Sequence, residues 1–209
     1  MKKCILLFGL FAGLTASLPA QNVATSVSYR NGIFTTTVTV PVSAPHSAAS
    51  QVIDRFIHQY KNEVDLLFGW ALKEVNLQGE KDGFMIFNIL SHSLSGNVVE
   101  GAMDMEAVAL GKRYKSVTYK VHLDKVIDTP DTLEILYKLY DCQDVIQNVD
   151  ARLKFTLQNR RTVQLSLVAD VKLTSFYNTM VSRAAYDKNM TWRFAKFVEN
   201  MAKAAQNPQ

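Results

Sequence analysis

The sequence predicts an α+β fold in which a curved antiparallel sheet packs on a long C-terminal helix, with one N-terminal helix and one inserted helix. Three observations predict it: a C-terminal segment with helical periodicity, several segments with the alternation of half-buried strands, and turn signals between them. Residues 174–206 contain neither Gly nor Pro, and their apolar residues recur along one helix face. That face carries Met190, Phe194, Phe197, Val198, Met201 and Ala205, and Phe176, Met180 and Ala184 extend it backwards. Only the preceding strands can cover such a face, so we expect the sheet to wrap around this helix.

Residues 1–20 have the pattern of a signal peptide. Lys2 and Lys3 give a positive start, residues 5–14 form an apolar run, and small residues lead to a cleavage position near Ala20. The run is short for a bilayer span, and an uncleaved N-terminal anchor is the alternative. We therefore expect export to the periplasm or the extracellular space. No later segment of the sequence is apolar and long enough to predict a transmembrane helix.

Residues 21–209 are expected to form a single α+β domain, since no repeat, low-complexity tract or linker interrupts them. Loss of Lys2 and Lys3 with the signal peptide would lower the formal net charge from +4 to +2. The basic pI is therefore no sign of a nucleic-acid partner, and none is expected. Cys142 is the only cysteine after residue 20, so the exported chain has no internal disulfide. We expect Cys142 to be buried and inert on the inner face of a helix.

The first structural element after the signal peptide is a predicted β-hairpin over residues 26–40. Asn31-Gly32 is a strong signal for a two-residue turn, because both central residues of a type I′ turn need positive φ. Such a turn pairs Tyr29 with Phe34. The apolar residues of both strands then share one face, and threonines occupy the other.

An amphipathic helix follows the hairpin. It is expected to begin within residues 47–50, to end at Gly69 and to bend near Asn62. A strand pair over residues 72–78 and 84–91 comes next, and the second of these strands is apolar on both faces.

Residues 97–126 are predicted to form another hairpin around a three-residue loop. The side-chain pattern pairs Met105 with Val117 and Met103 with Tyr119, which places the apolar residues on one face. The opposite face then holds Glu100, Asp104, Glu106, Ser116, Thr118, Lys120 and His122.

The inserted helix is predicted over residues 129–148. Thr129-Pro130 has the pattern of an N-cap followed by proline at the first helical position. Its inner stripe is Ile135, Leu139, Cys142, Ile146 and Val149. Two strands over residues 151–158 and 162–173 complete the sheet, and their alternation pairs Phe155 with Leu165.

This order of elements resembles the START-like, polyketide-cyclase-like helix-grip superfamily, in which a curved antiparallel sheet wraps its terminal helix. The resemblance covers most of residues 34–205 and rests on element order. The predicted helix at residues 129–148 departs from that order and is interpreted either as a lid or as part of the core. A rival resemblance is to exported bacterial domains of unknown function with a TBP-like fold, which begin with a similar strand, a turn like that of residues 40–43 and an amphipathic helix. Neither resemblance supplies catalytic residues.

Acidic residues and a histidine on one sheet face are the candidates for chemistry. Glu100, Asp104, Glu106 and His122 share the face, and Glu100 and His122 are expected to be cross-strand neighbours. One interpretation is a metal or acid/base site. The other, which the ordinary solvent-face neighbours favour, is a wet face with cross-strand ion pairs. No catalytic residue, metal or cofactor is therefore predicted.

The large apolar residues on inner faces are the candidates for ligand contact: Met85, Phe87, Met103, Tyr119, Met190, Phe194 and Phe197. Core filling is their default explanation, but in a helix-grip fold an apolar or lipid-like ligand would lie between the sheet and the C-terminal helix. We therefore expect an exported, non-enzymatic protein that binds such a ligand. One alternative is a cell-envelope structural or interaction module with a protein partner and no ligand. Another is a hydrolase or metal enzyme around Glu100, Asp104 and His122.

Overall fold

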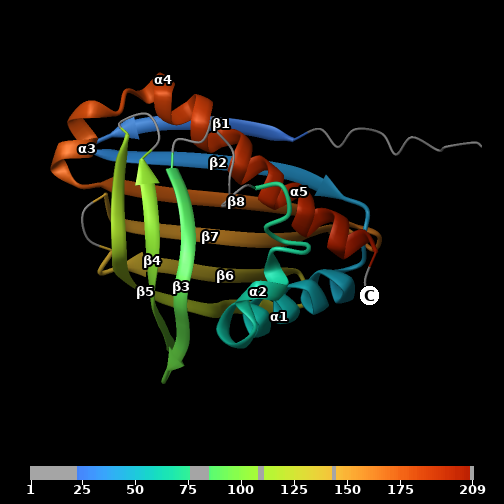
Figure 1. The fold of residues 1–209 in the computed structure, drawn as a ribbon. Coiled ribbons are helices and arrows are strands. Elements are labelled where there is room, and N and C mark those ends of the chain that lie inside the picture. Colours follow the sequence, from blue (N-terminus) through green and yellow to red (C-terminus); the bar gives the residue numbers. More distant parts are fainter. Residues whose placement is uncertain (1–22, 76–84, 108–110, 143–144, 208–209) are drawn as a thin grey trace, which may run out of the picture.

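The computed structural model describes residues 23–75, 85–107, 111–142 and 145–207. It contains one eight-stranded sheet in the order β1-β2-β8-β7-β6-β5-β4-β3, with every neighbouring pair antiparallel (Figure 1). The strands are β1 (Ala24–Arg30), β2 (Ile33–Val42), β3 (Met85–Ser95), β4 (Val98–Ala107), β5 (Lys112–Thr129), β6 (Thr132–Tyr140), β7 (Ile146–Asn159) and β8 (Thr162–Leu173). The predicted signal peptide lies outside the described residues.

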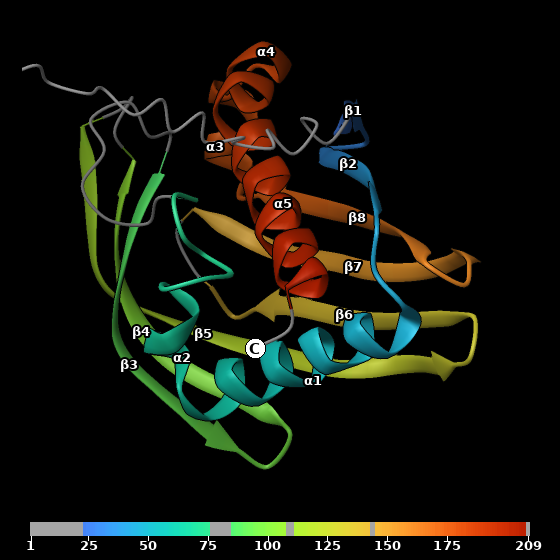
Figure 2. The ribbon, with the colours of Figure 1, turned by 90° about the vertical axis from the view of Figure 1, so that its right-hand side faces the viewer.

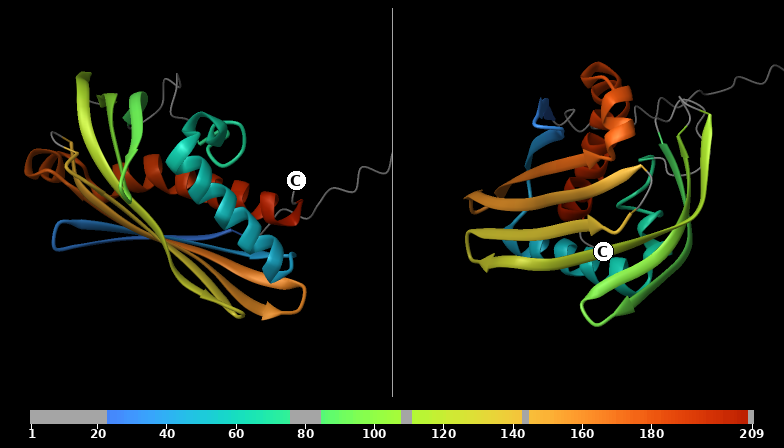
Figure 3. Two further views of the ribbon diagram at one scale, coloured as in Figure 1. Left: turned by 90° about the horizontal axis from the view of Figure 1, so that it is seen from below. Right: turned by 90° about the vertical axis from the view of Figure 1, so that its left-hand side faces the viewer.

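The sheet is strongly bent. β3, β4 and part of β5 stand steeply to the remaining strands, so that the sheet has a concave face (Figures 1 and 3). β-Bulges interrupt the ladders between Ile89 and Ser91, between Met103 and Met105, and between Lys125 and Ile127. Since a bulge bends its strand and increases the local twist, these three positions account for curvature in this half of the sheet.

The helices lie on the concave side, as Figure 2 shows, with α5 crossing between the β1–β2 edge and the β3–β4 wall. They are α1 (His46–Asn62), α2 (Val64–Leu67), α3 (Ser175–Met180), α4 (Arg183–Tyr186), the π-helix η2 (Asp187–Thr191) and α5 (Trp192–Gln206). The predicted bend near Asn62 is the end of α1. Within the described ranges, none of these helices has the length and apolar character that a membrane span requires.

The C-terminal helix docks its apolar face into the sheet as predicted, but only from Met190 onward. Val198, Met201 and Ala205 are buried, whereas Phe176, Met180 and Ala184 are exposed. The predicted continuous helix is wrong before this point. The backbone of Val181 is extended, and the side chain of Ser182 caps a new helix by accepting a hydrogen bond from the amide of Ala185. The break and the π-helix together turn the earlier residues out of the stripe.

Two hairpins have the predicted register. In β1–β2, Tyr29 pairs with Phe34 around the Asn31-Gly32 turn, where both φ values are positive. In β7–β8, Phe155 pairs with Leu165.

The β4–β5 hairpin has the predicted faces but not the predicted register. Met103 pairs with Val117 rather than with Tyr119, and Met105 pairs with Tyr114. Ser116 has a φ of 54° at the bulge, so one strand carries an extra residue there. Beyond the bulge the pairing is displaced by two residues. Because side chains alternate with period two, the same set still faces inward.

The inserted helix predicted over residues 129–148 is wrong, because this stretch forms β6 and the start of β7. Thr129 and Thr132 flank a two-residue turn, and the hydroxyl of Thr129 accepts a hydrogen bond from the amide of Thr132. Cys142 is buried as predicted, but it follows β6 rather than lying on a helix.

The strand predicted over residues 72–78 is also wrong as far as the structure describes it. Residues 72–75 are turns that follow α2, and the amide of Leu72 donates to the carbonyl of Leu67 at 2.8 Å. The remaining residues, 76–78, lie outside the described ranges. The next strand, β3, runs to Ser95 rather than to residue 91.

Candidate ligand cavity

A cavity of about 330 Å³ lies between the concave face of the sheet and the helices. The sheet contributes apolar side chains from β3 to β8, among them Met103, Ile135, Leu139, Leu153 and Leu167. The helical side contributes Phe56, Tyr60, Val64, Leu67, Met190, Phe194 and Phe197. The helix-grip arrangement therefore leaves a space where the prediction put a ligand, between the sheet and the start of the C-terminal helix.

Five of the seven predicted ligand-binding residues line this cavity: Met103, Tyr119, Met190, Phe194 and Phe197. The side chains of Met85 and Phe87 lie outside the part of the chain that the structure describes. Their backbones belong to β3 and pair with Ala107 and Met105. Contact of any of these residues with a ligand stays a prediction.

The turn after α2 forms one side of the cavity and is held by α5. The side-chain amide of Asn200 donates hydrogen bonds to the carbonyls of Ala71 at 3.2 Å and of Lys73 at 2.6 Å. Leu72 and Val75, which flank this contact, line the cavity. α5 therefore fixes two walls at once, its own apolar face and this turn.

Four tyrosines bring hydroxyl groups to walls that are otherwise mostly hydrocarbon. The hydroxyl of Tyr186 accepts a hydrogen bond from Thr36 at 3.5 Å, and the other three hydroxyls belong to Tyr60, Tyr119 and Tyr137. Tyr60 of α1 donates a hydrogen bond to the hydroxyl of Tyr137 of β6 at 3.4 Å. Burial raises the pKa of Tyr60 well above its ordinary value, and the neighbouring Tyr137 adds to the effect. Burial also raises the pKa of Tyr137, and that of Tyr119 to about 12. All three phenols are therefore protonated at neutral pH.

His92 of β3 ties these hydroxyls to the protein frame. Its Nε2 lies 2.5 Å from the carbonyl of Tyr60, which can only accept, so Nε2 carries a proton. The carbonyl is one of those that the end of α1 leaves without a helical partner. The other ring nitrogen, Nδ1, lies 2.9 Å from the hydroxyl of Tyr119. The Tyr119 hydroxyl also donates a hydrogen bond to the carbonyl of Ser91 at 3.3 Å, so it is held by two groups of β3.

Gly101 makes the contact between Tyr119 and β3 possible. Gly101 pairs with Tyr119 across the β4–β5 ladder. A Cβ on Gly101 would collide with the carbonyl of Ser91 and with the phenol of Tyr119. A glycine inside a strand often marks such a close approach. Gly101 is therefore a sequence signal for this contact that the alternation of side chains alone does not reveal.

Arg193 of α5 is the charged residue among the described lining residues. It is 5% exposed, and its guanidinium carbon lies 4.8 Å from the centroid of the Trp192 ring. No carboxylate or thiol of the described residues lines the cavity, and the described ranges hold no cluster of His, Cys, Asp and Glu that would bind a metal. Tyr60, Tyr137, His92 and Arg193 were missed as site residues. Of these, Tyr137 was assigned to a helix that does not exist.

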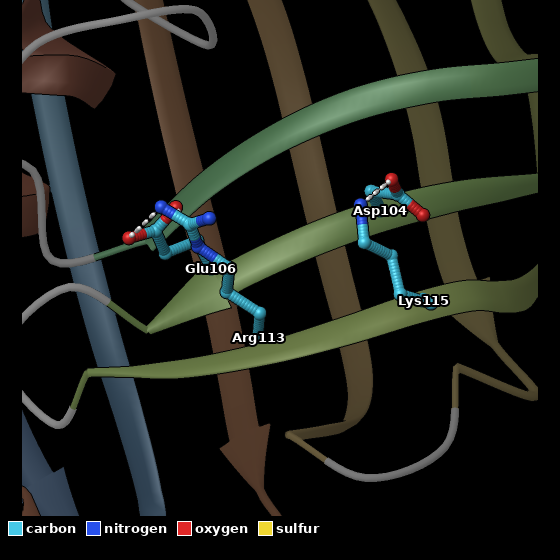
Figure 4. Close-up of polar contacts among 4 residues, drawn as sticks. All are labelled: Asp104, Glu106, Arg113 and Lys115. Atoms are coloured by element: carbon cyan, nitrogen blue, oxygen red, sulfur yellow. Dashed lines mark hydrogen bonds and ion pairs between the residues drawn. The ribbon is translucent and has the colours of Figure 1, made fainter.

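The sheet face that carries Glu100, Asp104, Glu106 and His122 is an outer surface on which ion pairs form, two of which are drawn in Figure 4. Lys115 lies 2.6 Å from Asp104, and Arg113 lies 2.9 Å from Glu106. The expected pairing of Glu100 with His122 is wrong. Glu100 pairs with Lys120, and the Nε2 of His122 lies 2.7 Å from Asp124. These contacts favour the solvated interpretation of the face over the metal or acid/base one.

Comparison with known proteins adds the fold. No protein-family model matches the sequence, and no curated protein sequence matches it. The Zhui aromatase/cyclase from Streptomyces sp. R1128 matches with a TM-score of 0.50 at 12% identity, over 83% of this chain and 94% of that chain. The human StarD13 (DLC2) lipid transfer and protein localization domain gives 0.46 at 11% identity, over 91% of each chain. Norcoclaurine synthase from Thalictrum flavum gives 0.47 at 11% identity, over 100% of this chain and 99% of that chain.

At such identities the likeness concerns the fold alone. The rival TBP-like fold is not supported by these comparisons. An open, bent antiparallel sheet that grips a C-terminal helix, together with the match to the aromatase/cyclase, identifies the architecture. The chain has the START-like, polyketide-cyclase-like helix-grip fold.

Proposed function

We propose that this protein binds an apolar or lipid-like small molecule in the cavity between the sheet and the C-terminal helix, without catalysing a reaction on it. The observation that carries the proposal is the cavity of about 330 Å³ with almost wholly hydrocarbon walls. Ligand pockets of proteins start near this volume, at about 300 Å³. It is roughly twice the engineered cavity of about 150 Å³ that binds benzene.

The loss of packing contacts around an unfilled space supports the same proposal. Apolar side chains that line such a space lack the close contacts of a filled core, and a bound apolar ligand would supply them. A cell-envelope module without a ligand would be expected to fill this space with side chains, so the cavity favours ligand binding over that alternative.

The absence of catalysis is proposed from the chemistry of the walls. The described lining residues offer hydroxyls and one guanidinium but no carboxylate, thiol or free imidazole. Two of the structural neighbours, the aromatase/cyclase and norcoclaurine synthase, are enzymes by name. The fold therefore does not exclude catalysis, and the non-enzymatic proposal rests on these residues alone.

Native mass spectrometry of the purified protein tests the proposal, followed by uptake of a neutral apolar fluorophore such as N-phenylnaphthylamine. Ala151→Phe adds bulk inside the cavity and should weaken uptake about tenfold or more, since overpacking costs about 1–3 kcal/mol. Val168→Phe adds similar bulk to an exposed position of β8, outside the cavity, and is the matched control. Protein that carries no ligand and takes up no fluorophore would refute the proposal.

Export remains a second proposal, supported by the pattern of residues 1–20. It predicts that the protein recovered from its producing cell begins near Gln21, which intact-mass measurement reads directly. A cytoplasmic protein that retains residues 1–20 would contradict it.

A further inference from the structure

We propose that the hydroxyl pair of Tyr60 and Tyr137 anchors the ligand through one neutral hydroxyl group, so that the ligand is an apolar alcohol rather than a fatty acid or a hydrocarbon. This inference rests on the proposed function, because it names the chemistry of the molecule in the same cavity. It commits the polar end of the ligand to the side of the cavity where α1 meets β6.

The hydrogen-bond inventory of the pair leaves room for one hydroxyl. Each phenol has one proton to donate and can also accept. Tyr60 donates its proton to Tyr137, and the structure gives the Tyr137 proton no described acceptor. The Tyr60 oxygen likewise receives no described hydrogen bond at its side chain. A ligand hydroxyl would accept from Tyr137 and donate to Tyr60, which closes a ring of three hydroxyl groups.

The pair is held in place before any ligand arrives. His92 binds the backbone carbonyl of Tyr60 and lies edge-on to the Tyr60 ring, with ring centroids 5.3 Å apart. The rings of Tyr60 and Tyr137 also meet edge-on, at 5.7 Å and 84°. Fixed donors lose little conformational freedom when they bind, so their hydrogen bonds contribute more to affinity.

A neutral group fits this position better than a charged one. The phenols stay protonated because burial raises their pKa values, so they supply hydrogen bonds but no charge. A carboxylate bound there would lose its hydration without gaining a positive partner from the pair. Among the described lining residues the positive charge belongs to Arg193, which lies on α5, whereas the tyrosine pair joins α1 to β6. An anionic ligand would therefore be expected to seek Arg193 and to ignore the pair.

Three probes with the same ten-carbon hydrocarbon chain distinguish a hydrocarbon, an alcohol and a fatty acid as ligands: decane, decanol and decanoate. Each is measured by displacement of N-phenylnaphthylamine from the purified protein. We expect decanol to bind roughly three- to tenfold more tightly than decane, the effect of about one neutral hydrogen bond. We also expect decanol to bind more tightly than decanoate at neutral pH. This ranking needs no variant, so it stands even if a substitution impairs folding.

Variants then locate the anchor. In Tyr60→Phe/Tyr137→Phe both hydroxyls are lost while both rings remain, and the affinity ratio of decanol to decane should fall to about one. Each single Phe variant keeps one phenol that can still donate, so it should retain part of the preference. Tyr140→Phe is the matched control, because Tyr140 lies on the same strand but does not line the cavity.

The outcomes are distinct. A decanol preference that survives in the double variant would overturn the anchor while leaving the cavity as a binding site. If decanoate binds most tightly of the three probes, both to the parent and to the double variant, the anchor would be overturned in favour of an anion site at Arg193. Failure of all three probes to displace the fluorophore would remove the proposed function together with the anchor.

Discussion

The two ends of the C-terminal helical segment meet very different surroundings. Toward the C-terminus, Val198, Met201 and Ala205 are at most 1% exposed. Toward the N-terminus, Met190, Phe194 and Phe197 are only half-buried, and their open sides line the cavity. The helix itself packs against β2, β8 and α1.

Side-chain size explains the difference. Small residues such as Ala202 and Ala205 let a helix lie close to its support, and large ones hold the helix away from it. Phe194 and Phe197 are large and line the cavity. One end of the helix therefore closes the core, and the other end leaves a space beside it. The lesson is that a single amphipathic stripe supplies stability at one end and a binding wall at the other.

The largest expected effect is on stability at the closed end of the helix, where Val198, Met201 and Ala205 are buried. The open end is the one where Met190, Phe194 and Phe197 line the cavity. Met201→Ala should lower the free energy of unfolding by about 2–5 kcal/mol, because a fully buried methionine is lost and the site is too well packed to collapse. Met190→Ala is the same substitution at the open end, where the side chain already faces a cavity, and should cost about 1 kcal/mol or less. Urea denaturation measures both. Equal losses at the two positions would erase the distinction between the two ends.

The next effect is on binding at the open end. Phe194→Ala removes part of the cavity wall and should weaken uptake of N-phenylnaphthylamine about tenfold. Met201→Ala, measured under conditions where it remains folded, should leave uptake nearly unchanged. The pair of variants thus tests whether stability and binding separate along the helix. A Phe194→Ala protein that binds as tightly as the parent would place the ligand elsewhere.

Most of the fold follows from periodicity, and the errors show where periodicity stops being informative. In β4–β5, alternation assigns Met103 and Tyr119 correctly to the inner face, but a displacement by two residues leaves every face unchanged. The turn and the bulge decide the register, and the positive φ of Ser116 has no clear sequence signal. By contrast, Asn31-Gly32 sets both the turn and the register of β1–β2.

The inserted helix was mispredicted because a short apolar run fits two periods. Leu133, Ile135 and Leu139 are buried as residues of a strand, yet Ile135 and Leu139 are also four apart, as on a helix. The cost was functional as well as structural. Tyr137 alternates with its neighbours into the cavity, but on a helix it would have pointed elsewhere. The apolar lining of the cavity is therefore predictable from the sequence, whereas the hydroxyl pair of Tyr60 and Tyr137 is not.

The smallest effect is expected on the convex face, which gives a baseline for both ends of the helix. A hydrogen bond from Lys115 and one from the amide of Ser116 hold the pKa of Asp104 below its ordinary value of 3.8. A depressed pKa means that this stabilisation is present above the unfolded-state pKa and is lost as the pH falls through the folded-state pKa. Asp104→Asn should therefore be slightly less stable than the parent at neutral pH, and the difference should shrink as the pH falls below 3.8. Because Asp104 is only partly buried and its partner Lys115 is exposed, solvent screens their interaction, and the change should be far smaller than that of Met201→Ala. The effect of Met201→Ala has no titrating cause and should persist across the same pH range. Urea denaturation of both variants at pH values from about 7 to about 3 makes the comparison. A loss at Asp104 as large as the one at Met201 would contradict the expectation that surface ion pairs contribute far less to stability than the buried end of the helix.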